Sequence, residues 1–161
     1  MASQAKKAFS YALASAVPFR ELDAVGIGVI FKASDRSTVK ALNIALEETT
    51  PLAAAYEAVM MVLDEALSTG TRGIAIYVDL PEVVAQLNGE ADVPREVLGK
   101  HLQARGMINQ VGRVRLMVAD SPNFSARLLA ESANSQHAPP AGSQQRQLSL
   151  IQQNVPAWET L

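Results

Sequence analysis

The sequence predicts an α/β domain with a five-stranded mixed sheet and flanking helices. Three strand-like runs come first and suggest an antiparallel meander. After about residue 50, helical and strand-like segments alternate, which is typical of strands added in parallel to the same sheet. The chain has 161 residues, 48% of them hydrophobic and 19% charged, so it can bury a core as one domain.

The first three strands are predicted at residues 7–16, 24–33 and 39–48. The second run is the best candidate because it is rich in β-branched residues. Gly26 and Gly28 lie on one face of it, which indicates close approach by a neighbouring backbone. The run at 39–48 fits a strand by its alternation, but its period also fits a helix, and both interpretations stay open.

The clearest helix is predicted at residues 51–69. Thr50 suits the N-cap, Pro51 suits the first helical position, and Gly70 ends the helix. The remaining elements are a strand at 73–79, helices at 81–89 and 94–108, a strand at 113–119 and a helix at 123–133. The predicted order is therefore β-β-β-α-β-α-α-β-α. Residues 134–161 are rich in Gln, Pro and Ser and predict a flexible tail, with a docking segment near 148–158 that includes Trp158.

Composition excludes several functions. The chain has no cysteine and two histidines in unrelated contexts, so thiol catalysis, disulfides and zinc sites built on cysteine or histidine clusters are not expected. No apolar run is long enough to span a bilayer. The first residues are similar to a signal peptide, but a first strand with an exposed start explains them better. We expect a cytoplasmic protein of net charge −2.

Four stretches in order resemble the ribonuclease H superfamily, in particular the cellular type 1 enzymes. Residues 50–59 resemble the first-helix motif T-N-N-x-A-E-Y-E-A-L, and residues 77–90 resemble D-S-x-L-V-V-x-Q-I-N-G-E. Gly26-Ile27-Gly28 resembles the G-x-G of the second strand. Residues 114–133 resemble the last strand and helix. The resemblance covers residues 7–133 and implies a ribonuclease H-like domain over residues 1–133.

The resemblance implies hydrolysis of the RNA strand of RNA–DNA hybrids with two divalent ions, Mg²⁺ or Mn²⁺. Four carboxylates hold these ions in the family, because hard cations prefer oxygen ligands. Glu57 aligns with the helix glutamate and Asp79 with the aspartate that ends the fourth strand. Leu13 and Arg127 align with the other two carboxylate positions. We expect a degenerate site without metal, in which Arg127 neutralises both Glu57 and Asp79 as a partly buried ion pair.

Simpler interpretations accompany these residues. Glu57 alone suits an exposed helix position, and Asp79 suits a helix N-cap, a role it could combine with that of a site remnant. Asp120 suits a cap of the last helix better than a replacement ligand. Glu21 and Asp23, in the loop after the first strand, are the remaining acids that could complete a metal site.

A basic group follows the fourth strand. Arg95, Lys100 and Arg105 lie on or near the helix at 94–108 and suit phosphate contacts, although a solvated helix surface explains them equally well. The leading prediction is a catalytically inactive domain that binds nucleic acid weakly or serves as an interaction module. Its alternatives are a residual metal-dependent ribonuclease and a structural or homo-oligomeric module that does not touch nucleic acid. No contact with a membrane is expected.

Overall fold

The computed structural model describes residues 8–19, 24–121 and 124–136. The elements follow the predicted order: β1 Tyr11–Pro18, β2 Ala24–Lys32, β3 Thr38–Glu47, α1 Pro51–Thr69, β4 Gly73–Val78, α2 Pro81–Leu87, the 3-10 turn η2 Arg95–Val97, α3 Leu98–Val111, β5 Arg113–Val118 and α4 Ser125–Gln136. The residues predicted as the tail from 137 onward, and Glu21 and Asp23, lie outside the described residues.

The sheet has the strand order β3-β2-β1-β4-β5. β1 pairs antiparallel with β2 and parallel with β4, while β3 is antiparallel to β2 and β5 is parallel to β4. The segment at 38–47 is therefore a strand. Its helical period does not prevail because β2 needs a hydrogen-bonding partner on the side away from β1, and β3 supplies it over nearly its whole length.

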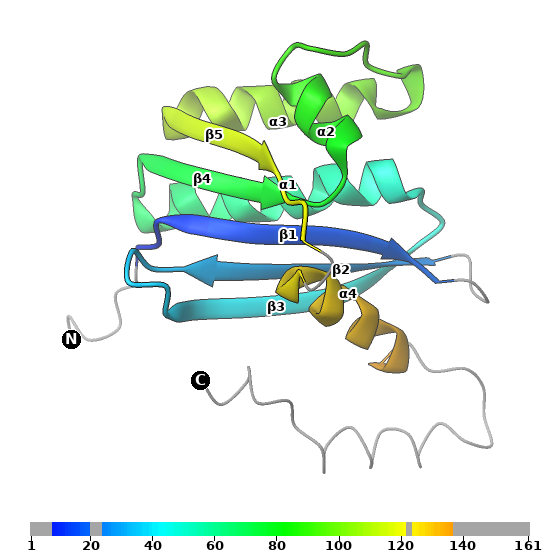
Figure 1. The fold of residues 1–161 in the computed structure, drawn as a ribbon. Coiled ribbons are helices and arrows are strands. Elements are labelled where there is room, and N and C mark those ends of the chain that lie inside the picture. Colours follow the sequence, from blue (N-terminus) through cyan, green and yellow to red (C-terminus); the bar gives the residue numbers. More distant parts are fainter. Residues whose placement is uncertain (1–7, 20–23, 122–123, 137–161) are drawn as a thin grey trace.

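Helices cover the two faces of the sheet unequally (Figure 1). The main core forms where α1, α2 and α3 pack against one face, and its fully buried members include Ile27, Phe31, Leu63 and Ile76. Among the described helices, α4 is the one on the opposite face, where it packs on β2, β1 and β3. On that face, α4 therefore does not cover β4 and β5.

The two glycines of β2 allow α4 to approach. A Cβ on Gly28 would lie 2.3 Å from the carbonyl oxygen of Ala126, and one on Gly26 would lie 2.3 Å from that of Ala130. Any side chain at either position would collide with the backbone of α4. The expected close backbone approach is confirmed, and the neighbour is α4.

Most predicted element ends agree with the structure. The Thr50 hydroxyl accepts from the backbone N–H of Ala53 at 3.2 Å, and Gly70 ends α1 in the left-handed conformation with φ 69°. Several ends differ. β1 starts at Tyr11 rather than near residue 7, and the helix predicted at 94–108 begins with the 3-10 turn η2 and runs to Val111. α4 continues through Gln136, so residues 134–136 are helical rather than tail.

Among the described helices, none is at once long enough and apolar enough to cross a membrane.

Candidate functional site

Asp79 follows directly after β4 and lies at the centre of a compact polar cluster. Its side chain is only 6% exposed. One oxygen, Oδ2, accepts a hydrogen bond from the Ser15 hydroxyl at 2.8 Å and another from Arg127 Nε at 2.8 Å. Ser15 comes from β1 and Arg127 from α4, so three elements meet at this carboxylate. Such partners satisfy a buried anion that would otherwise be costly.

The N-cap interpretation of Asp79 is wrong. α2 has Leu80 at its N-cap, with no side-chain hydrogen bond to the helix backbone. The physical reason is that the Asp79 carboxylate points to the face that carries Ser15 and Arg127, where it finds a charged donor. Pro81 at the start of α2 removes one of the backbone donors that a cap would satisfy.

Arg127 binds Asp79, but the structure does not join Arg127 to Glu57. The Glu57 carboxylate instead pairs with the ammonium group of Lys100 on α3. The expected single cation for two carboxylates is therefore corrected to two cations, one for each. The reason is the direction of Glu57, which leaves α1 toward α3, whereas α4 lies on the opposite face of the sheet.

The first-helix motif also holds two glutamates, and this chain has Ala55 at the first and Glu57 at the second. Ala55 is fully buried and offers no ligand atom. Glu57 is already paired with Lys100. On either alignment, the matched position of α1 supplies no unpaired carboxylate to a metal.

Leu13 does not lie beside Asp79. It pairs with Tyr77 in the register between β1 and β4, and it lines a neighbouring pocket. Ser15, two residues later on the same face of β1, is the first-strand residue in contact with Asp79. Ser15, and not Leu13, is therefore the β1 residue whose side chain is hydrogen-bonded to the strand-end acid. Since side chains alternate along a strand, an alignment shifted by two residues keeps the correct face and is hard to detect from sequence.

The donor set does not suit a pair of divalent ions. Ser15 and Leu13 lack a carboxylate, and Arg127 places a positive charge against the one strand-end acid. Within the described residues, His, Asp and Glu nowhere form a group of three or more able to hold a metal ion. Asp120 belongs to no such group, and α4 begins at Ser125, five residues after Asp120.

A buried polar chain joins α1, α2 and α3, and sequence reasoning did not identify it. The Tyr56 hydroxyl donates to Gln86 Oε1 at 2.7 Å and lies 3.0 Å from His101 Nδ1. Because a hydroxyl has one proton, it accepts from Nδ1–H of His101. Burial raises the pKa of Tyr56 to about 12, and burial together with the Arg105 charge lowers the pKa of His101. The signal was present in the matched motifs, since Tyr56 and Gln86 both belong to them.

The three predicted phosphate contacts differ in their surroundings. Lys100 is held by Glu57, and Arg105 donates from Nη1 to the carbonyl oxygen of Leu87 at 2.9 Å. Arg95 lies in η2, is exposed, and has no ion-pair partner within the described residues. Lys100 and Arg105 therefore organise α3 locally, while keeping further N–H donors for other contacts.

The strand order, with α4 on one face of the sheet and the other described helices on the opposite face, is that of a ribonuclease H-like fold. The chain is similar to the type 1 ribonuclease H of the halophilic archaeon Halobacterium salinarum NRC-1, with a TM-score of 0.71 and 20% identity over 78% of this chain and 97% of that one. It is similar to the N-terminal ribonuclease H domain of a Mycobacterium tuberculosis protein, with a TM-score of 0.68 and 22% identity over 76% and 98%.

A third similar structure is a type 1 ribonuclease H solved in complex with an RNA/DNA hybrid, with a TM-score of 0.70 and 18% identity over 79% of this chain and 97% of that one. At these identities the similarity establishes the fold alone. No protein-family model and no curated protein matches the sequence.

Proposed function

We propose that this protein is a catalytically inactive ribonuclease H-like domain that binds nucleic acid, with an RNA–DNA hybrid as the first ligand to test. The observation that carries the proposal is the 2.8 Å bond between Arg127 and Asp79. Two-metal hydrolysis needs several carboxylates converging on two dications. A guanidinium against the central carboxylate repels those dications and supplies no ligand atom.

Support for nucleic-acid binding comes from the fold and from α3. A structural neighbour of this chain was solved with an RNA/DNA hybrid. Arg95, Lys100 and Arg105 all belong to η2 or α3, and Lys100 is 37% exposed. The net charge of −2 limits long-range attraction, so we expect weak binding that depends strongly on salt.

A cleavage assay tests the loss of catalysis. An RNA–DNA hybrid is incubated with the full chain and Mg²⁺ or Mn²⁺, beside an Asp79→Asn variant. We expect no hydrolysis above background for either protein. Metal-dependent cleavage by the natural chain that disappears in Asp79→Asn would establish the residual nuclease instead.

A binding assay tests the ligand. We expect hybrid affinity to fall as salt rises, and to fall roughly 10-fold or more when Lys100→Glu and Arg105→Glu are combined. Arg72→Glu, an exposed arginine in the loop before β4, is the charge-matched control. If the chain shows no hybrid binding at low salt and is a stable oligomer in sedimentation, the structural-module alternative replaces the proposal.

A further inference from the structure

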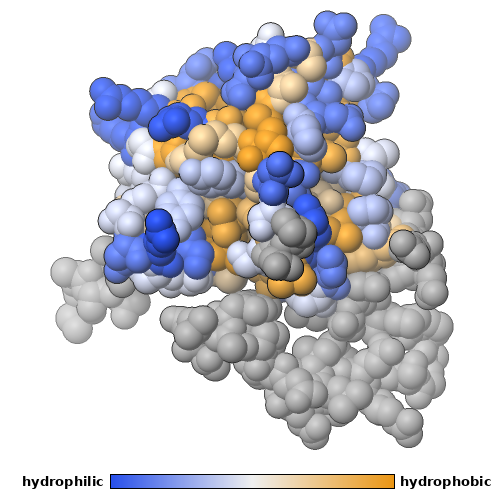
Figure 2. Space-filling model, in the orientation of Figure 1, coloured by the Kyte–Doolittle hydropathy of each residue, from blue (hydrophilic) through white to orange (hydrophobic). Residues whose placement is uncertain are grey.

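The face of the sheet that α4 leaves open carries an aromatic pocket. Tyr11 and Leu13 of β1 and Ala75 and Tyr77 of β4 share this face and line the pocket, with Phe124 at one end. The rings of Tyr11 and Tyr77 meet edge to face with centroids 6.1 Å apart. In the space-filling view of this face, hydrophobic surface shows in the middle with hydrophilic side chains around it (Figure 2).

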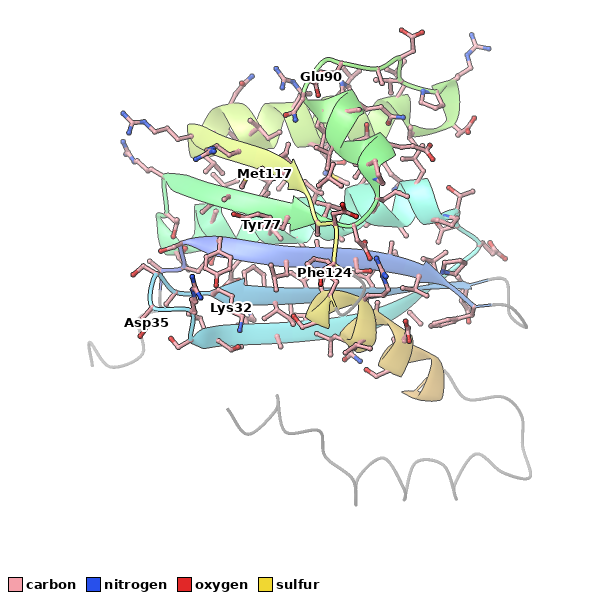
Figure 3. All side chains as sticks on the ribbon, in the orientation of Figure 1. Lys32, Asp35, Tyr77, Glu90, Met117 and Phe124 are labelled. Atoms are coloured by element: carbon pink, nitrogen blue, oxygen red, sulfur yellow. The ribbon has the colours of Figure 1, made fainter. Side chains whose placement is uncertain are left out.

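β5 extends the same face and adds cations. Met117 pairs with Tyr77 in the parallel register, and both lie on the open face (Figure 3). Arg115 pairs with Ala75 two residues earlier, so it lies on the same face. The opposite side of β5 faces the core, as the burial of Leu116 shows. Arg115 is exposed and has no ion-pair partner within the described residues.

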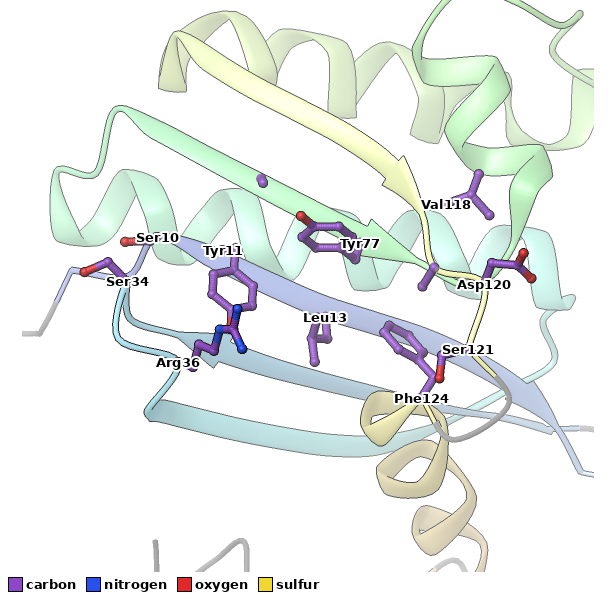
Figure 4. Close-up of a pocket in the computed structure, with 12 residues that line it drawn as sticks. Ser10, Tyr11, Leu13, Ser34, Arg36, Tyr77, Val118, Asp120, Ser121 and Phe124 are labelled. Atoms are coloured by element: carbon purple, nitrogen blue, oxygen red, sulfur yellow. The ribbon is translucent and has the colours of Figure 1, made fainter.

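The pocket has opposite charges at its two ends (Figure 4). Arg36, from the turn between β2 and β3, stands with Ser34 at the end near Tyr11, whereas Asp120 stands at the other end near Phe124. Neither Arg36 nor Asp120 has an ion-pair partner within the described part of the chain. The volume is about 750 Å³, which lies within the roughly 300–1,000 Å³ of small-molecule sites.

The geometry points to a nucleotide-binding site on this open face. Because the two tyrosine rings are nearly perpendicular, a flat base can stack on one of them, as bases do on exposed aromatic side chains. Its phosphate lies at Arg36, since a guanidinium group binds phosphate through paired N–H donors. An amino or hydroxyl donor at the far end of the ligand meets the Asp120 carboxylate.

This site deepens the proposed function and rests on it, because a nucleotide can arrive free or as a unit of single-stranded RNA or DNA. It is separate from α3, where hybrid binding is tested. It adjoins the Asp79 cluster, because Ser15 follows Leu13 and Asp79 follows Tyr77 by two residues on the same faces of β1 and β4.

The experiment is a titration of the isotope-labelled full chain with adenosine monophosphate, uridine monophosphate and a 10-nucleotide single strand, followed by nuclear magnetic resonance. We expect shifts in Tyr77 and its strand neighbours, and about 10-fold weaker binding in both Tyr77→Leu and Arg36→Gln. Arg95→Gln, an exposed arginine on η2, is the matched control and should bind normally. Binding of the mononucleotides identifies a free-nucleotide site, and binding of the strand alone identifies a single-strand site.

Three results would overturn the proposal. One is no shift with any of the three ligands, and another is binding that Tyr77→Leu and Arg36→Gln leave unchanged. The third uses Trp158, the one tryptophan in the sequence. If Leu13→Asp red-shifts the fluorescence emission of Trp158 and the natural chain binds no nucleotide, the tail segment near 148–158 occupies the pocket instead. Loss of hybrid binding in the α3 variants, with strand binding kept, would concern the α3 surface alone.

Discussion

The Asp79 carboxylate shares one oxygen between the Ser15 hydroxyl and the Arg127 guanidinium. At the scale of single residues, these two contacts change the chemistry of the strand-end acid. A carboxylate that faces metals needs open lone pairs, whereas this one is desolvated and paired. Arg127 is itself 36% exposed, so water weakens the attraction compared with a fully buried pair.

Replacing Arg127 by glutamine should destabilise the fold. We expect a loss of about 1–3 kcal/mol in the free energy of unfolding, because Asp79 stays buried with only Ser15 as donor. Asp79→Asn combined with Arg127→Gln should cost less than the sum of the two single changes, since each single change leaves one charge unpaired and the double change leaves none. Urea unfolding of the four proteins measures this cycle.

The pair Lys40–Glu65 is the control, because its N–O distance is longer, 3.3 Å, and its carboxylate is more exposed, 14% against 6% for Asp79. Lys40→Gln should cost under about 1 kcal/mol. Equal losses for Arg127→Gln and Lys40→Gln would contradict a special role for the Arg127 contact.

Returning carboxylates to the site should create a metal site. Ser15→Asp with Arg127→Asp places two new acids beside Asp79, since both natural side chains contact its Oδ2. Without metal the three carboxylates repel and stability falls; added Mn²⁺ should raise the melting temperature of this variant by several degrees. Differential scanning calorimetry measures the shift. The natural chain and the Arg127→Asp variant are controls, and an equal Mn²⁺ response in all three would contradict the placement of Ser15.

At the scale of elements, α4 depends on the absence of side chains in β2. Gly28→Ala would put a Cβ 2.3 Å from Ala126 O and 2.5 Å from Ala130 N, both backbone atoms. We expect α4 to be displaced, because the backbone of a helix and of a central strand cannot yield locally. Hydrogen exchange should show lost protection along α4 and a stability loss of several kcal/mol.

Gly106→Ala is the matched control. Gly106 lies inside α3 with open space where a Cβ would be, so alanine should stabilise the chain by about 0.5–1 kcal/mol through its higher helix propensity. If both substitutions had the same effect, the close approach of α4 would not be what requires glycine in β2.

At the scale of the whole molecule, the Tyr56–Gln86–His101 chain couples stability to pH at both ends of the range. Burial raises the pKa of Tyr56 to about 12, so its contribution is complete below about pH 10 and disappears as the pH rises through 12. The lowered pKa of His101 means that its contribution is complete above about pH 6.5 and is lost as the pH falls below that value.

Unfolding midpoints across pH 4–12 should therefore form a plateau between about pH 6.5 and 10. Tyr56→Phe should reduce the fall of the unfolding midpoint above about pH 10, and His101→Gln should reduce its fall below about pH 6.5. Ultraviolet titration should find one tyrosine that ionises near 12 in the natural chain and is missing in Tyr56→Phe. If both variants keep the pH dependence of the natural chain, other groups cause it.

Much of the fold was predictable because its signals are local. Strand alternation, the Thr50 cap, Pro51 and Gly70 each act within a few residues, so the order of elements and the ends of α1 agree with the structure. The helical period at 39–48 competed with alternation, and pairing with β2 decided between them.

The sequence alone showed which positions of the strand-end site lack a carboxylate, because Arg127 stands in the last-helix motif and no acid occurs at residues 11–18 of β1. Tertiary structure decided which groups meet. Ser15 and Asp79 are 64 residues apart, and Glu57 finds Lys100 across 43. A shift of two residues along β1 changes no face, so only the register against β4 distinguishes Ser15 from Leu13. The open face with Tyr11, Tyr77 and Arg115 likewise exists only once β1, β4 and β5 are aligned and α4 has covered the other strands.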